Sequence, residues 1–345
     1  MKINFICPPA SGNGGTETVL TKILNHYAQE HELTLTLTTK PENDNWLNSI
    51  DKNVNVKIPS HDDKLSKRLF FIKTFINTKN DENLVMLGAN MIKVAATIRK
   101  VLHKKYRIVS WIHYSLFDQN MFDPKNILFA DYHLAIASKI KEQLIQIGAP
   151  EEKIKLIYNP IERNHVRNTD QLTNEITYIG RTQFNGQKNL KELIDGLKKA
   201  NDMHLSVIGT EKNDQIVKDY IAKEGLSERV TWYGWQKDPW ALIENKTLAI
   251  VLTSKFEGLP MVFLEAISRG IPVISADFAG YDDVVKENIN GLSYPQGNTD
   301  KLAEQINKIK ELTSNPIKIA NSISNFYSEN YFNNLDKVFS EILIK

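Results

Sequence analysis

Short apolar runs alternate with longer stretches of helical period along the whole chain of 345 residues, and this pattern constrains the fold more than any other feature. Short apolar runs between turn residues predict buried strands, and apolar residues spaced three and four apart predict helices. Strands that alternate with helices predict parallel sheets, because a parallel pair needs a crossover connection that is usually a helix. The sequence therefore predicts an α/β fold.

The predicted strands form two series, which are separated by a polar stretch over residues 162–174. The first series comprises residues 3–7, 33–38, 54–58, 84–87, 108–113, 133–137 and 155–157, and the second comprises 176–179, 205–209, 230–233, 248–253 and 272–275. We therefore expect two Rossmann-like domains, residues 1–162 and 163–325, with a C-terminal helix over 326–345 that packs back on the first. Ligands of such sheets bind beyond the carboxyl ends of the strands, so we expect both sheets to face a shared cleft.

The composition excludes several classes of protein. A single cysteine, Cys7, excludes a disulfide framework and any Cys-rich metal site, and no His-Glu-x-x-His motif is present, so we expect no metal. No apolar run approaches the roughly 20 residues that span a bilayer, and the apolar start of the chain is too short for a secretory signal. We therefore expect a cytoplasmic protein. The net charge of +2 lacks the basic stripe of a nucleic-acid-binding protein.

Gly12, Gly14 and Gly15 make a glycine-rich turn between the first predicted strand and its helix. Such turns let backbone N–H groups approach an anion at a helix N-terminus. Glu17 occupies the third glycine position of a dinucleotide fingerprint, and the Lys-Ser/Thr ending of a P-loop is missing. This is either a tight turn without a ligand or, as we prefer, a turn that lines the cleft.

The corresponding turn of the second domain carries two cations, Arg181 and Lys188, between a predicted strand and a predicted helix. Two cations beside a helix N-terminus suit a diphosphate and can stabilise charge on a leaving group. The alternative is that both are solvated cations on a loop.

Two carboxylates accompany the helix predicted over residues 260–269. Glu257 precedes it, and Glu265 lies inside it among apolar neighbours, where a carboxylate is costly unless it is paired. A ribose is a suitable partner, because its diol offers two hydroxyl donors. Gly258 permits close backbone approach, and the N–H groups of the first turn can bind phosphate. Alternatively, Glu257 is an ordinary acid at a helix start and Glu265 a half-exposed helix residue.

Together these motifs resemble the retaining glycosyltransferases of the GT-B fold, family 4. The resemblance rests on Glu257 and Glu265 with seven residues between them, on Arg181 with Lys188, and on the N-terminal glycine turn. The sequences around Phe256 and around Trp235 are similar to the corresponding sequences of bacterial lipopolysaccharide 1,6-galactosyltransferases. The resemblance implies transfer of a hexose, galactose or glucose, from a UDP-sugar to a hydroxyl of a glycan or lipid-linked glycan precursor, with retention.

The resemblance also implies a role for each matching residue. Arg181 and Lys188 would neutralise the leaving diphosphate, Glu257 would contact hydroxyls of the sugar, and His113 matches a histidine near the reacting carbon. The residues that would bind the donor are Gly14, Gly15, Tyr233, Trp235, Gly258, Leu259, Pro260, Met261, Val262 and Glu265. No metal, cofactor or protein nucleophile is implied, because the cations and the helix N-terminus take the metal's place. His113, at a strand end, is alternatively a structural residue.

The predicted helix over residues 64–79 concerns the acceptor. Leu65, Leu69, Ile72 and Ile76 share one helical face, and the same stretch carries five cations and no acid, the cations being Lys64, Lys67, Arg68, Lys73 and Lys79. An apolar face with a basic border is typical of a helix that lies on an anionic membrane. The alternative is an ordinary helix that covers the sheet and has a solvated basic edge.

Two other functions fit the same architecture. A UDP-sugar epimerase with two facing domains would need general acid and base residues near the sugar. A clamshell sugar-binding protein would be exported, and the missing export signal and the Arg181–Lys188 pair argue against it. We prefer the transferase.

Overall fold

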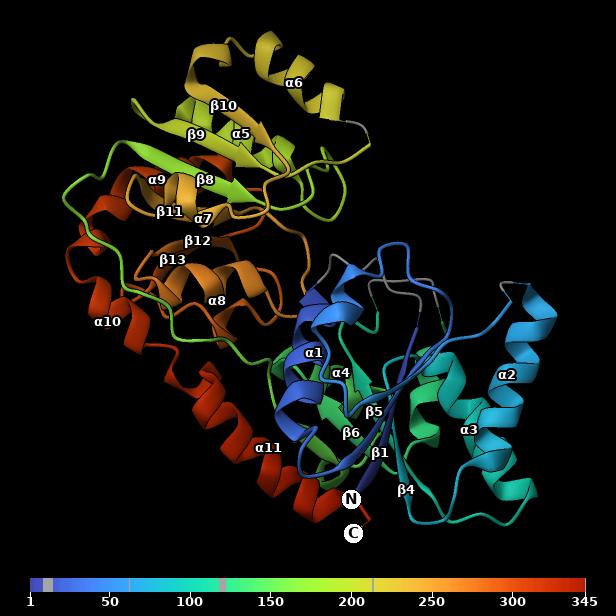
Figure 1. The fold of residues 1–345 in the computed structure, drawn as a ribbon. Helices are drawn as coiled ribbons and strands as arrows, with labels where there is room; N and C mark the ends of the chain where they lie inside the picture. Colours follow the sequence, from blue (N-terminus) through green and yellow to red (C-terminus); the bar gives the residue numbers. More distant parts are fainter. Residues whose placement is uncertain (9–14, 62, 118–121, 213, 345) are drawn as a thin grey trace. The chain divides into compact units, whose positions relative to one another are not determined.

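The computed structural model describes residues 1–8, 15–61, 63–117, 122–212 and 214–344. The chain divides into two compact units, one of Met1–Pro160 together with Tyr331–Lys345 and the other of Ile161–Asn330. Each unit is built around one parallel sheet with helices packed on it, as Figure 1 shows. The predicted α/β class with two parallel sheets is therefore confirmed.

The first unit contains a seven-stranded sheet in the order β3-β2-β1-β4-β5-β6-β7, and every neighbouring pair is parallel. The strands are β1 (Lys2–Cys7), β2 (Glu32–Leu37), β3 (Asn55–Lys57), β4 (Glu82–Met86), β5 (Arg107–Ile112), β6 (Tyr132–Ala135) and β7 (Ile154–Leu156). Its helices are α1 (Gly15–Tyr27), α2 (Lys64–Asn77), α3 (Ala89–Val101) and α4 (Ser138–Gln146), with 3₁₀ turns η1 (Asn45–Ser49), η2 (Pro124–Phe129) and η3 (Glu151–Lys153). The central strands are buried along nearly their whole length, because helices cover both faces.

Helix α11 (Ser328–Ile342) brings the end of the chain back to the first unit. The hydroxyl of Tyr27 on α1 donates to Asp336 Oδ1 at 2.7 Å, and the ring of His26 stacks on Phe332 at 3.6 Å between centroids. Asn83 at the start of β4 exchanges two hydrogen bonds with the backbone of Ile344. These contacts explain why residues 331–345 belong to the first unit.

The second unit contains a six-stranded parallel sheet in the order β10-β9-β8-β11-β12-β13. The strands are β8 (Glu175–Ile179), β9 (His204–Ile208), β10 (Val230–Gly234), β11 (Thr247–Leu252), β12 (Val273–Ala276) and β13 (Gly291–Tyr294). The helices are α5 (Leu190–Lys199), α6 (Asp214–Lys223), α7 (Trp240–Ile243), α8 (Met261–Ser268), α9 (Thr299–Lys308) and α10 (Pro316–Asn321). Short 3₁₀ turns are η4 (Ser227–Arg229), η5 (Tyr281–Asp283), η6 (Ile309–Ser314) and η7 (Ser324–Phe326).

The strand order of the second sheet reverses between β8 and β11. Strands β9 and β10 lie on one side of β8, whereas β11, β12 and β13 lie on the other. Loops that leave adjacent strands at such a reversal diverge to opposite faces and leave a crevice, which is where open α/β sheets bind ligands. The loop with Arg181 and Lys188 follows β8, and the loop with Glu257 follows β11. The topology therefore places both predicted loops at one edge of one sheet.

The second sheet contains one strand that the sequence did not predict. Strand β13 was not predicted, because its four residues begin with glycine and include a serine, which leaves no recognisable apolar run. Helix α9 ends at Lys308, and the chain continues as the 3₁₀ turn η6. Among the described residues, no helix is both long enough and apolar enough to cross a bilayer.

Candidate functional site

Hydrogen bonds join the loop after β8 to the loop after β11. Thr253 is fully buried, and its hydroxyl donates to the carbonyl oxygens of Lys188 at 3.1 Å and Asn189 at 3.0 Å. The backbone N–H of Lys255 donates to the Gln187 carbonyl at 2.8 Å. Backbone groups that are buried at strand ends need hydrogen-bond partners. Here each loop supplies hydrogen-bond partners for the other loop. The two loops therefore form one structural element at the carboxyl edge of the sheet.

An ion pair between the two loops brings together two of the predicted catalytic residues. Lys188 Nζ lies 2.6 Å from Glu257 Oε1, and only 16% and 10% of the two side chains are exposed. A pair so shielded from water is stronger than a surface salt bridge, although each charge loses hydration. The site therefore holds its lysine and its carboxylate in direct contact.

Gln187 connects this pair to Arg181, the third predicted catalytic residue. Its Oε1 accepts from the Arg181 guanidinium at 3.0 Å, while its Nε2 donates to the Phe256 carbonyl at 2.9 Å and lies 3.5 Å from Glu257 Oε2. Gln187 was not predicted as a site residue, because an amide in a polar turn carries no specific signal. Its position between two predicted cations was the only available hint.

Two glycines allow the ends of β8 and β9 to approach closely. A Cβ atom at Gly209 would lie 1.9 Å from the Gly180 carbonyl oxygen, and φ is +137° at Gly209 and +154° at Gly180. Both values lie in the region where side chains are strained. The buried hydroxyl of Tyr178 donates to the Arg181 carbonyl at 2.6 Å, and burial raises the pKa of that phenol. The backbone of Arg181 is thus fixed, whereas its side chain is exposed.

The N-terminus of α8 supplies backbone donors next to Glu257. Pro260 caps the helix, and the N–H groups of Phe263 and Leu264 donate to its carbonyl. Within the part of the chain that the structure describes, the N–H groups of Gly258, Leu259 and Val262 donate to no hydrogen bond. Unpaired N–H groups and the positive end of the helix dipole attract an anion.

Glu265 lies on the first turns of α8, four residues after Met261 and hence on the same helical face. Its side chain is half-buried, and its backbone carbonyl accepts from Ser268 Oγ at 2.8 Å and from the Arg269 guanidinium at 2.9 Å. The predicted apolar surroundings are present, since Phe263, Leu264 and Ala266 are all fully buried. The carboxylate therefore lies on the exposed side of an otherwise buried helix.

Tyr233 and Trp235 lie at the carboxyl end of β10, the edge strand of the same sheet. Tyr233 is half-buried, and its carbonyl accepts from Gln236 Nε2 at 2.8 Å. Trp235 is 65% exposed, which is unusual for so large an aromatic side chain. An exposed indole ring offers a flat surface on which a planar base can stack.

The remaining predicted site residues belong to the first unit. Gly14 lies outside the described residues, and Gly15 is the exposed first residue of α1. His113 follows β5, and its buried Nε2 has no hydrogen-bond partner within the described ranges. Burial lowers the pKa of His113 to about 3, so the ring is neutral at pH 7.

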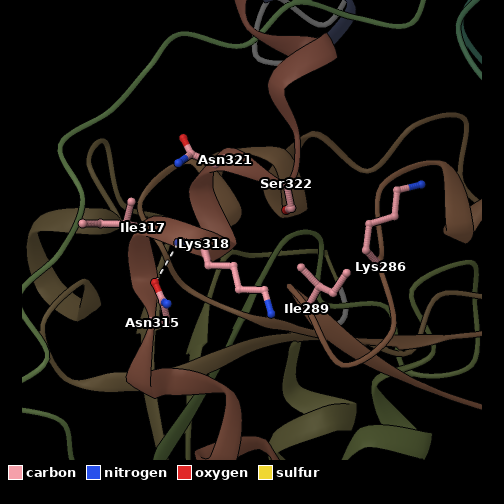
Figure 2. Close-up of a pocket in the computed structure, with 7 residues that line it drawn as sticks. All are labelled: Lys286, Ile289, Asn315, Ile317, Lys318, Asn321 and Ser322. Carbon is pink, nitrogen blue, oxygen red and sulfur yellow. Dashed lines mark hydrogen bonds between the residues drawn. The ribbon is translucent and has the colours of Figure 1, made fainter.

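The second unit also contains a cavity of about 560 Å³, whose lining residues are drawn in Figure 2. Its lining residues are Lys286, Ile289, Asn315, Ile317, Lys318, Asn321 and Ser322. Lys286 and Ile289 precede β13, so the cavity lies at the amino edge of the sheet, opposite the Lys188–Glu257 pair.

Among the described residues, no group of three or more His, Cys, Asp or Glu side chains could hold a metal ion.

Comparisons with known proteins agree on one family. The family model described as "Glycosyl transferases group 1" matches residues 161–325. The chain is 33% identical to the lipopolysaccharide 1,6-galactosyltransferase of Escherichia coli K12, and the match covers 98% of each chain. It is 31% identical to the enzyme of the same name from Salmonella typhimurium LT2, with 99% of each covered.

Solved structures give the same result. The apo form of the lipopolysaccharide outer core galactosyltransferase WaaB superposes with a TM-score of 0.86 at 32% identity, and 99% of this chain and 100% of that chain are covered. Anabaena HepE in complex with UDP superposes with a TM-score of 0.81 at 20% identity over 99% of this chain and 100% of that chain, a likeness of fold alone.

Proposed function

Because the chain belongs to the group 1 glycosyltransferases, we propose that it transfers a hexose, galactose or glucose, from a UDP-sugar to a hydroxyl of a bacterial glycoconjugate precursor, with retention. The observation that carries this proposal is the cluster of Arg181, Gln187, Lys188 and Glu257 beside the unpaired N–H groups that precede and begin α8. Cations and N–H donors at one edge of a sheet are suited to a diphosphate leaving group.

In the proposed reaction, the bond between the anomeric carbon and the β-phosphate oxygen breaks, and the acceptor oxygen bonds to that carbon on the same face. The acceptor proton passes to an oxygen of the departing diphosphate, and UDP leaves. Arg181 and Lys188 stabilise the negative charge that develops on UDP, together with the N–H groups of Gly258 and Val262. No protein nucleophile takes part.

The other residues bind and orient the donor. Glu257 accepts hydrogen bonds from sugar hydroxyls while it remains paired with Lys188, and Glu265 accepts from the ribose diol. Trp235, with Tyr233, lies against the base, which we take to be uracil. In the first unit, we keep Gly14 and Gly15 as donor-binding residues on the resemblance alone, and the neutral ring of His113 has a buried Nε2, without a partner among the described residues, that can hydrogen-bond to a sugar hydroxyl.

We assign charge neutralisation to these protein groups without a metal. Turnover should therefore be unchanged when the enzyme is treated with EDTA and assayed in a chelating buffer. A loss of activity that Mg²⁺ or Mn²⁺ restores would contradict this assignment. The control is the same chelator treatment applied to the coupling enzymes of the assay.

The two alternatives predict different products from the same experiment. Purified protein is incubated with UDP-galactose or UDP-glucose, with and without hexose-terminated acceptors, and UDP is quantified. UDP release that depends on acceptor supports transfer, sugar isomerisation supports an epimerase, and binding without turnover supports a sugar-binding protein. Membership of a glycosyltransferase family favours the first outcome, and the lipopolysaccharide enzymes named above make a lipopolysaccharide core the first acceptor to test.

Glu265→Ala tests the ribose assignment. Loss of a carboxylate that accepts two hydroxyl donors should weaken UDP binding about tenfold to a hundredfold. Isothermal titration with UDP measures this affinity. Titration with 2′-deoxyuridine diphosphate, which lacks the 2′-hydroxyl, gives the matched comparison, since the Glu265→Ala variant should bind both nucleotides equally. Unchanged UDP affinity in Glu265→Ala would contradict the assignment.

We further propose that the first unit binds an anionic membrane through α2. Leu65, Leu69, Ile72 and Ile76 are exposed by 67%, 58%, 42% and 43%, whereas the helix packs on its sheet through buried Phe71 and Phe75. The stripe thus faces away from the sheet, which argues against an ordinary covering helix. Helix α3 contacts α2 and lies beside it, and it adds Val94 and Val101 as further exposed apolar side chains (Figure 1).

Vesicle flotation tests the membrane surface. The wild type should float with vesicles that contain anionic lipid, less so at high salt, because the cations attract the headgroups and the apolar side chains insert. Leu69→Glu with Ile72→Glu should abolish flotation. Ile216→Glu is the matched control, since Ile216 is 50% exposed on α6 and has no such basic stripe. Equal flotation of all three proteins would contradict the proposal.

A further inference from the structure

A buried carboxylate lies behind the loop that carries Lys188. Glu192, in the first turn of α5, is 7% exposed. Its Oε1 accepts from the Tyr294 hydroxyl at 2.8 Å and from the Gly297 N–H at 2.9 Å, and its Oε2 accepts from Asn189 Nδ2 at 2.6 Å. All three donors are neutral, and within the described residues Glu192 forms no salt bridge. Such a carboxylate is retained only where its hydrogen bonds are well satisfied.

The hydrogen bond to Asn189 fixes an unusual backbone conformation. Asn189 directly follows Lys188 and has φ +51° and ψ +49°, the left-handed region that most side chains avoid. Its side chain is held by Glu192, and its carbonyl accepts from the buried Thr253 hydroxyl at 3.0 Å. The residue after Lys188 is therefore held from both sides.

The same network reaches a third strand end. Tyr294 is the last residue of β13, and Gly297 follows in the next loop. In that loop Gln296 Nε2 donates to the Ser254 carbonyl at 3.1 Å, beside Thr253. Glu192 is thus the common acceptor that connects the β13 loop to the Lys188 loop.

We propose that Glu192 is a positioning residue for the transfer reaction. By holding Asn189 in its left-handed conformation, it keeps the Lys188 ammonium against Glu257, where charge develops on the leaving diphosphate. This inference rests on the proposed function for its kinetic consequence, but its structural consequence concerns Lys188 alone. A carboxylate with only a structural role would stabilise the start of α5 through the helix dipole and would leave Lys188 in place.

Glu192→Ala and Glu192→Gln separate the two roles. We expect Glu192→Ala to lower kcat about tenfold or more and to change the donor KM less, because Lys188 acts mainly on the developing charge. Glu192→Gln should restore most of kcat. Its amide oxygen can accept from Tyr294 and Gly297, and Asn189 can turn its own oxygen toward the new N–H donors.

The matched control is Asn290→Ala at the opposite edge of the same sheet. Asn290 is fully buried, and its Nδ2 donates to the Val284 carbonyl at 3.0 Å and to Ser322 Oγ at 2.8 Å. Ser322 lines the cavity in Figure 2. Asn290→Ala should lower Tm about as much as Glu192→Ala while keeping kcat near the wild-type value. Loss of kcat in proportion to Tm in both variants would overturn the proposal.

A second readout needs no substrate. Lys188 is 16% exposed and paired, so it should react slowly with acetic anhydride, and peptide mass spectrometry gives its rate relative to Lys301, which is 38% exposed. In Glu192→Ala that ratio should rise several-fold, and in Asn290→Ala it should not change. An unchanged ratio in Glu192→Ala would overturn the inference even where transfer is intact. If the wild type transfers no hexose, the proposed function fails while the labelling result still decides the role of Glu192.

Discussion

Lys188 and Glu257 form an ion pair with 2.6 Å between Nζ and Oε1, although 69 positions separate them in the sequence. The pair exists because β8 and β11 are neighbours in the sheet and the loops that follow them are joined by Thr253 and Lys255. The two predicted catalytic side chains therefore neutralise each other's charge. Neither of these two shielded charges is left uncompensated.

The single substitution Lys188→Ala should destabilise the protein more than the combined substitutions Lys188→Ala and Glu257→Gln do. Removing the lysine leaves a carboxylate that is 10% exposed without its cation, which should lower the free energy of unfolding by about 3 kcal/mol. Glu257→Gln then removes the uncompensated charge and recovers part of that loss. Urea unfolding of the two single variants and the double variant measures the coupling, and strictly additive changes would contradict it.

Arg181→Ala should slow the chemical step and leave the fold intact. The guanidinium is exposed and, among the described residues, forms one hydrogen bond, to Gln187, so its loss should change the free energy of unfolding by no more than about 0.5 kcal/mol. In the proposed reaction its charge stabilises the leaving diphosphate, so kcat should fall about a hundredfold. Exposed Lys237 in the same unit provides the control, since Lys237→Ala should alter neither quantity. A rise in donor KM with unchanged kcat would instead indicate uniform binding.

Trp235→Ala should weaken UDP binding about tenfold, because a base loses its stacking surface. Trp235→Phe retains a flat ring and should lose much less. Isothermal titration with UDP and with inorganic pyrophosphate separates base from diphosphate, since pyrophosphate should bind the three proteins equally. Equal UDP affinity of the wild type and both variants would remove Trp235 from the base site.

The fold and the outline of the site could be predicted because their signals are local. Apolar runs marked β8 and β11, and the charged turn residues Arg181, Lys188 and Glu257 stood directly after them. The direction in which α2 presents its apolar stripe could not be predicted, because Phe71 and Leu69 carry equally apolar side chains and only packing decides which is buried.

The supporting residues of the site could not be predicted for a different reason. Gln187 and Glu192 belong to residue types that are common on loops and helix starts, and their roles depend on partners that come from β11 and β13. Strand β13 itself was not predicted, so nothing in the sequence brought Tyr294 near α5. A single sequence does not show which residues that are far apart in the chain come into contact in the fold.

Two buried histidines should make the protein less stable as the pH falls below 7. Burial lowers the pKa of His133 to about 4 and of His113 to about 3, whereas an unfolded histidine titrates near 6.5. Between those values the unfolded chain binds a proton that the folded chain does not. The stabilisation is therefore complete above about pH 6.5 and is lost progressively as the pH falls.

For His133, which is 1% exposed and hydrogen-bonded to Ser110 Oγ at 2.8 Å, the loss between pH 7 and pH 5 should be about 2 kcal/mol. Urea unfolding at several pH values measures it, and His133→Gln should give a shallower dependence than the wild type, whereas exposed His103→Gln should not. A wild-type slope that His133→Gln leaves unchanged would contradict the lowered pKa of His133.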